Sequence, residues 1–142
     1  MKKLLLVLFL MININLMASN HYVTAEEKIY TSVLQALYGN KNLKIWCDDK
    51  MKSDIFSHIA HVSLTKNPQN ADILFVFHSF DIVSKKPKFV GSYALLKHYR
   101  SEAIGGFYWQ KGRPNLLFLR ANLSKAHLML SKALQKYIED SF

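Results

Sequence analysis

The chain has 142 residues and a formal net charge of +9, and half of its residues are hydrophobic while only three are proline. This composition excludes an intrinsically disordered chain. The length suffices for one domain with a single core, not for two. With Cys47 as the only cysteine, an internal disulfide is excluded as well.

The amino-terminal residues have the pattern of a secretory signal. Two lysines precede an apolar run over residues 4–10, which thins out around Asn13 and Asn15. A permanent membrane anchor is the alternative, but a spanning helix wants about 20 apolar residues and the two asparagines interrupt this run. We therefore expect export across the inner membrane to the periplasm.

Cleavage is expected after Ala18, with Ala25 as the second choice. Residues 1–18 are then the signal peptide, residues 19–26 a flexible segment, and residues 27–142 a single α/β domain. Loss of the two lysines in the signal lowers the net charge from +9 to +7. In an exported protein this charge favours an acidic partner or an anionic envelope surface over nucleic acid.

The first half of the chain alternates predicted helices and strands. Apolar residues at three- and four-residue spacing predict a helix over residues 27–38, ended by Gly39-Asn40. A short strand over residues 43–47 follows, then a helix over 50–58 and a brief strand over 61–64.

A continuous apolar run over residues 73–77 is the clearest strand signal, and it predicts a strand in the middle of a sheet with both faces covered. Residues 84–88, with the sequence SKKPK, are expected to form a basic loop. A short helix is expected over residues 91–100.

The last third predicts a β-hairpin and a terminal helix. Strand-forming residues over 103–110 and 115–120 flank the turn sequence KGRP. An amphipathic helix follows, from a cap at Asn122 or Ser124 nearly to the end of the chain. Together these elements predict an α/β sandwich with a central mixed, partly parallel sheet, a carboxy-terminal hairpin and a terminal helix.

The glycine pair in IGGFYWQKGRP could be part of a phosphate-binding loop. Such loops place their glycines after a strand and directly before a helix. Gly105-Gly106 opens a strand instead. We therefore expect these glycines, and Gly112 in the turn, to serve the backbone geometry of a hairpin.

Acidic residues follow the first predicted strand, where open α/β sheets bind ligands. Asp48 and Asp49 could contribute to a metal site, but His78 and Ser79, not a third aspartate, directly follow the apolar strand over residues 73–77, so capping of the next helix is the favoured alternative.

Asp54, His58 and His61 are spaced i, i+4 and i+7 and could bind zinc or copper if the helix were long enough to place them on one face. We expect the helix to end before His61, so a solvated face is the favoured alternative.

No spacing in the sequence identifies a catalytic set or a cofactor site. Cys47 lies in an apolar strand and is expected to be a buried thiol rather than a nucleophile. We therefore expect no enzymatic activity, no metal and no cofactor.

The order of elements in AIGGFYWQKGRPNLLFLRANLSKAHLMLSKALQKYI resembles the end of the YfiR-like family of exported bacterial proteins. Upstream, NADILFVF is similar to the central strand of that family, and the first helix with LKIWCDD is similar to its opening. The matching positions in the last third are Gly105, Gly106, Gly112, Arg113, residues 116–118, Asn122, Ala126, Leu128, Ser131 and Leu134.

The resemblance implies a Rossmann-like domain without catalysis that regulates a membrane-bound signalling protein. The expected partner is the outer domain of an inner-membrane diguanylate cyclase or sensor kinase. The alternative is a periplasmic small-molecule binding protein similar to one lobe of a solute-binding protein, with ligand near Asp48-Asp49 or the Tyr108 face, and self-association could then restore a two-sided site.

Residues for partner or ligand binding are expected in two places along the sequence. A binding surface needs aromatic or arginine anchors and a charged rim. If Phe107 and Trp109 pack inward, Tyr108 points to the opposite face, which is either covered by a helix or open. The candidate binding residues are Tyr108, Lys111 and Arg113 on the hairpin and Lys85, Lys86 and Lys88 in the basic loop.

Overall fold

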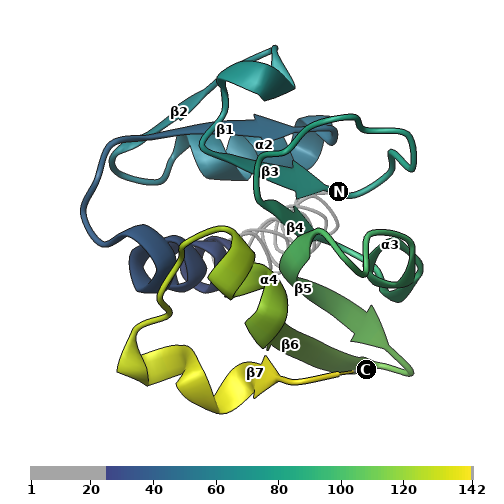
Figure 1. Ribbon diagram of the computed structural model, residues 1–142. Coiled ribbons are helices and arrows are strands. Elements are labelled where there is room, and N and C mark those ends of the chain that lie inside the picture. Colours follow the sequence, from purple (N-terminus) through teal and green to yellow (C-terminus); the bar gives the residue numbers. More distant parts are fainter. Residues whose placement is uncertain (1–24, 142) are drawn as a thin grey trace, which may run out of the picture.

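Seven strands form one sheet in the computed structural model, which describes residues 25–141 (Figure 1). The predicted signal peptide, residues 1–18, lies outside the described residues. The sheet confirms the expected α/β fold class, Rossmann-like and built on a central mixed sheet. Its strands are β1 (Leu43–Cys47), β2 (Val62–Leu64), β3 (Ile73–Val76), β4 (Lys88–Val90), β5 (Ala103–Gln110), β6 (Arg113–Leu119) and β7 (Ile138–Glu139).

The strand order across the sheet is β2-β1-β3-β4-β5-β6-β7. The first five strands are all parallel, β6 is antiparallel to β5, and β7 is parallel to β6. The order β2-β1-β3-β4-β5 is one of the two common orders of doubly wound sheets, in which the direction of winding changes between β1 and β3. The carboxyl ends of β1 and β3 therefore lie side by side.

Helices cover both faces of the sheet. A first helix over residues 25–38 and α2 (Lys50–Ser57) pack on one face, where Tyr30 and Phe56 meet Phe75 of β3. The short helix α3 (Tyr93–His98) packs on the other face through Leu95 and Leu96. Residues 25 and 26, expected in the amino-terminal segment, already belong to the first helix.

Strand β3 lies in the interior of the sheet with both faces covered, as predicted, although β4 is the middle strand of the seven. All four residues of β3 are fully buried. Ile73 and Phe75 point to the core under the first helix, whereas Leu74 and Val76 point to the core under α3. A strand covered on both faces needs apolar residues at every position, which explains its unbroken apolar run.

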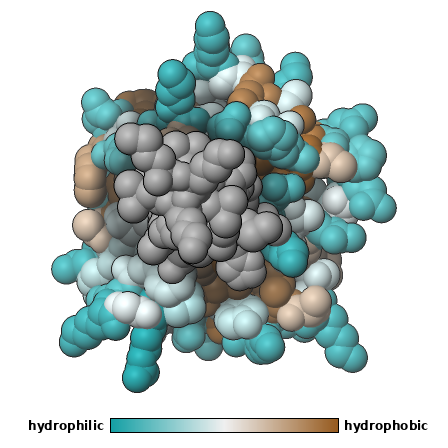
Figure 2. Space-filling view, turned by 180° about the vertical axis from the view of Figure 1, so that it is seen from behind, coloured by the Kyte–Doolittle hydropathy of each residue, from teal (hydrophilic) through white to brown (hydrophobic). Residues whose placement is uncertain are grey.

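Hydrophilic side chains project around the margin of the molecule, with hydrophobic patches between them, when it is viewed from behind (Figure 2). Within residues 25–141, none of the helices is long and apolar enough to cross a bilayer.

The predicted basic loop contains a strand that sequence reasoning missed. Lys88 begins β4 and only 1% of it is exposed. Its Nζ donates to the Ser84 carbonyl at 2.6 Å and lies 2.9 Å from a carboxylate oxygen of Glu102. Because these partners satisfy the buried charge, a lysine can occupy this buried strand position. From residue type alone, a lysine here is expected in an exposed loop.

The hairpin prediction is confirmed, with a tighter turn than expected. Gln110 pairs with Arg113, so the turn consists of Lys111 and Gly112 alone. Both have positive φ, 51° at Lys111 and 72° at Gly112, as a two-residue type I′ turn requires. A Cβ at Gly106 would lie 2.8 Å from the Val90 carbonyl oxygen, so this glycine allows β4 and β5 to approach.

The long terminal helix predicted from Asn122 or Ser124 is wrong. The chain instead forms α4 (Arg120–Lys125), a 3₁₀ helix η2 (Lys132–Tyr137) and the edge strand β7. His127 adopts φ of 54°, and the amides of His127 and Leu128 donate to the carbonyls of Ser124 and Leu123 at 3.0 Å each. This Schellman motif ends α4, although a histidine holds the position where glycine is usual.

Candidate functional site

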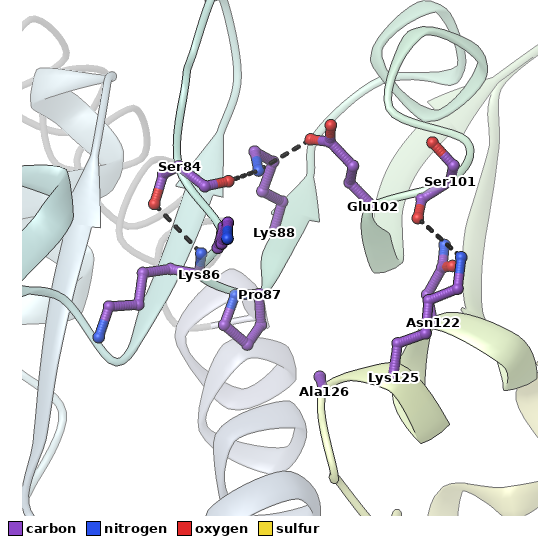
Figure 3. Close-up of a pocket in the computed structure, with 10 residues that line it drawn as sticks. Ser84, Lys86, Pro87, Lys88, Ser101, Glu102, Asn122, Lys125 and Ala126 are labelled. Carbon is purple, nitrogen blue, oxygen red and sulfur yellow. Dashed lines mark hydrogen bonds and ion pairs between the residues drawn. The ribbon is translucent and has the colours of Figure 1, made fainter.

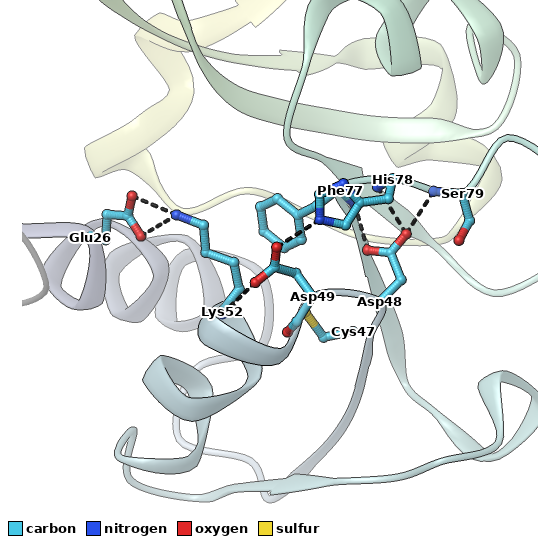
Figure 4. Close-up of polar contacts among 8 residues, drawn as sticks. All are labelled: Glu26, Cys47, Asp48, Asp49, Lys52, Phe77, His78 and Ser79. Carbon is cyan, nitrogen blue, oxygen red and sulfur yellow. Dashed lines mark hydrogen bonds and ion pairs between the residues drawn. The ribbon is translucent and has the colours of Figure 1, made fainter.

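The carboxyl ends of β1 and β3 are joined by one carboxylate (Figure 4). Asp48 accepts backbone N–H bonds from Phe77 at 2.7 Å, His78 at 2.9 Å and Ser79 at 2.7 Å. This is the point where doubly wound sheets commonly bind ligands. Here, however, the aspartate holds the chain after β3, and these three hydrogen bonds already occupy three of the about four acceptor positions of its carboxylate.

Asp49 caps α2, as the favoured interpretation predicted. Its Oδ1 accepts the Lys52 amide at 2.8 Å, and its Oδ2 lies 2.7 Å from His78 Nε2. Burial disfavours the charged carboxylate, but the hydrogen bonds from Lys52 and His78, together with their positive charges, lower the pKa of Asp49 overall. The Lys52 ammonium in turn donates to the Glu26 carboxylate at 2.6 Å.

Cys47 lies next to this network without the properties of a nucleophile. Burial raises the pKa of its thiol to about 11. Its Sγ lies 3.4 Å from the backbone oxygen of Asp49. The thiolate is the reactive form, so a thiol that stays protonated at neutral pH is poorly suited to attack a substrate.

Asp54, His58 and His61 do not share a helical face. The helix α2 ends at Ser57, and His61 lies beyond it with φ of 66°. The Nδ1 atom of His61 is 3.3 Å from the Asn42 amide oxygen. Among residues 25–141, no three His, Cys, Asp or Glu side chains are arranged to hold a metal ion.

The hairpin presents a different aromatic residue from the one predicted. Only 7% of Tyr108 is exposed, and its ring centroid lies 6.2 Å from that of Tyr93 in α3. A helix thus covers that face, and Tyr108 as a surface anchor is wrong. Trp109, expected inside if it packed with Phe107, is 60% exposed because it lies where β5 extends beyond the buried core.

Exposed basic residues accompany Trp109 at this end of the hairpin. Lys111 and Arg113 are both exposed, one in the turn and one at the first position of β6. We call Trp109, Lys111 and Arg113 the hairpin tip. One signal in the sequence could have identified the tryptophan, because only Gln110 separates it from the turn.

The predicted basic residues of the loop surround a pocket of about 240 Å³, which we call the lysine pocket (Figure 3). Lys88 forms part of its wall, but its ammonium is buried against Ser84 and Glu102, so it is not available to a docking macromolecule. Lys85 is exposed and Lys86 half-buried. The pocket is lined by residues 84–88, Ser101, Glu102, Asn122, Lys125 and Ala126.

The hairpin tip and the lysine pocket lie at opposite ends of β5. Lys88 pairs with Ala103, the first residue of that strand, whereas Lys111 follows Gln110, its last residue. Seven steps along a strand at about 3.3 Å each separate them by roughly 23 Å. The basic residues of the hairpin and of the loop, which lie in two places along the sequence, therefore also form two separate sites in the structure.

No family model, curated protein or solved structure matches this chain.

Proposed function

We propose that this protein is a non-catalytic, exported regulator that binds the outer domain of an inner-membrane signalling protein, either a diguanylate cyclase or a sensor kinase. The observation that carries the proposal is the hairpin tip, where Trp109 is 60% exposed and the exposed charges of Lys111 and Arg113 follow it within four residues of sequence. Tryptophan and arginine are the residue types that most often dominate binding energy at protein interfaces.

The hairpin holds this tip in a fixed geometry. Six residue pairs from Gly105–Phe118 to Gln110–Arg113 connect the two strands, and the turn has only two residues. A preformed surface loses little conformational entropy on binding. Positive charge at its margin would also speed encounter with an acidic partner.

The export signal and the YfiR-like order of elements support the location and the kind of partner. An exported domain of this size meets the outer domains of inner-membrane receptors in the periplasm. Its basic charge would favour an acidic surface on such a receptor. The proposed class of partner therefore rests on the resemblance, whereas the proposed binding surface rests on the exposed residues of the hairpin tip.

The test is capture of a membrane protein from envelope extract, followed by its identification by mass spectrometry. Trp109→Ala and the double variant K111E/R113E should each weaken capture by about tenfold or more. The double variant K66E/K132E makes the same change of net charge at two exposed lysines outside the hairpin, and it should retain capture.

Signalling output gives the second readout. Deletion of the gene should change the output of the cognate cyclase or kinase, and K111E/R113E should reproduce that change at unaltered protein abundance, because exposed charges contribute little to stability. If K66E/K132E lost capture equally, general charge rather than the tip would be responsible. A deletion that altered only uptake of a specific solute would favour the small-molecule carrier.

The carrier alternative has little support at the two positions first considered for it. Asp48 already accepts three backbone hydrogen bonds, and Tyr108 is buried under α3.

A further inference from the structure

The lysine pocket has an excess of positive charge. Four lysines and one glutamate line it. Glu102 is already paired with Lys88, at 2.9 Å, so its charge is neutralised within the wall. The remaining three, Lys85, Lys86 and Lys125, take part in none of the ion pairs found within residues 25–141.

The pocket also offers hydrogen-bond donors. Lys125 Nζ has only a long contact of 3.4 Å to the Ser101 carbonyl, so its other protons are free for a ligand. The Ser84 hydroxyl accepts the Lys86 amide at 3.1 Å and keeps its own proton to donate. Figure 3 shows the Lys86 side chain directed away from the other lining residues, so this lysine adds to the electrostatic field rather than to direct contact.

Two buried polar side chains fix the walls of the pocket. Asn122 is 5% exposed, and its amide nitrogen donates to the carbonyls of Arg100 at 2.9 Å and Ala103 at 2.7 Å. On the opposite side, buried Lys88 holds the Ser84 carbonyl and Glu102 together. The site therefore exists before any ligand arrives, which lowers the entropic cost of binding.

We propose that the lysine pocket binds a phosphate group, either free or carried by a small ester or a lipid headgroup. A phosphate presents acceptor oxygens to lysine and serine donors. With up to two negative charges it matches three uncompensated lysines better than a single carboxylate does. This site lies at the other end of β5 from the hairpin tip, so the proposal does not depend on the regulatory function.

The test is isothermal titration of the full mature chain at low salt with inorganic phosphate and with glycerol 3-phosphate. A parallel arm measures sedimentation with phosphatidylglycerol vesicles against phosphatidylcholine vesicles. The double variant K85Q/K125Q removes two exposed charges from the pocket, and K66Q/K132Q removes two exposed charges elsewhere as the matched control. Both variants keep the buried residues of the wall, so folding should be unaffected.

We expect K85Q/K125Q to weaken binding by about tenfold or more and K66Q/K132Q by less than about twofold. Binding of the soluble phosphates identifies a free ligand, while binding confined to phosphatidylglycerol vesicles identifies a lipid headgroup. The proposal is overturned if no phosphate source binds, or if the two double variants weaken binding equally.

Discussion

Asp48 and Asp49 are neighbours in the sequence, yet their carboxylates stabilise different parts of the fold. Asp48 joins β1 to the chain after β3, across 29 to 31 residues of sequence. Asp49 caps α2 locally, three residues away, and contacts His78. Asp48 therefore stabilises the tertiary arrangement of two strands, whereas Asp49 mainly stabilises one helix.

Replacing Asp48 by asparagine should destabilise the protein strongly. The substitution removes the charge and one of the two oxygens that accept the amides of Phe77, His78 and Ser79. We expect the free energy of unfolding in urea to fall by about 2–3 kcal/mol. Asp54→Asn, at an exposed position in α2, is the control and should change it by less than about 0.5 kcal/mol. Equal effects of the two substitutions would show that the three amide bonds contribute little.

The lowered pKa of Asp49 predicts a stability contribution that depends on pH. Because the folded pKa lies below the ordinary value of 3.8, the unfolded chain binds more protons in the interval between them. The contribution is complete above the ordinary value and is lost as the pH falls through the folded pKa. Asp49→Asn keeps a capping side chain but loses the charge.

Urea unfolding of the wild type and Asp49→Asn over a series of pH values measures this contribution. The wild type should be more stable at neutral pH, and the difference should disappear as the solution is acidified. A difference that stays constant with pH would mean that hydrogen-bond geometry, not charge, distinguishes the two proteins.

Single residues were predicted best where their surroundings follow from local sequence. The cap at Asp49 lies three residues from the amide that it accepts. The partner of Lys88 is Glu102, 14 residues away in the turn before β5, and nothing in SKKPK indicates that a lysine there is buried. Likewise, alternation along β5 cannot show that the core ends before Trp109.

The hairpin of β5 and β6 is the element with the clearest backbone requirement. A Cβ at Gly112 would meet no atom within 4 Å, yet its φ of 72° is in the left-handed region. A larger side chain there is therefore opposed by backbone conformation and not by collision.

Gly112→Val should lower the free energy of unfolding by about 1–2 kcal/mol, because a β-branched residue is strained at this φ. Thermal and urea unfolding would measure the loss. Lys111→Asn is the control and should not lower the free energy of unfolding. Asparagine tolerates the positive φ at this position, and the pair Asn-Gly favours a type I′ turn. A Gly112→Val protein as stable as the wild type would contradict the turn geometry.

Elements with strong local signals were predicted from the sequence, including β1 with both of its bounds. The terminal helix was not, because its apolar spacing continues through residues that fold back instead. Leu123 and Leu130 are both buried, as a helix would require, although the chain turns at His127 between them. The spacing of apolar residues shows which side chains are buried. It does not show where the backbone turns at a non-glycine residue with positive φ, such as His127.

At the scale of the whole molecule, export is the prediction that places this protein beside its proposed partner. The mature chain isolated from the envelope fraction should begin near Ser19 or Glu26, as amino-terminal sequencing would show. A chain that retained Met1 and stayed in the cytosol would remove the basis for a periplasmic partner. The lysine pocket could still bind phosphate in that case.

If the protein is exported as we predict, the strand order has a consequence for how the chain folds while it crosses the inner membrane. β3 pairs with the free edge of β1, and from β4 to β7 every strand pairs with the strand that directly precedes it in the sequence. A chain that appears amino end first can thus extend its sheet one strand at a time, always onto an edge that already exists. No later segment has to insert between two strands that have already paired. The sheet can therefore fold from its amino-terminal to its carboxy-terminal strands, in the order in which the chain crosses the membrane.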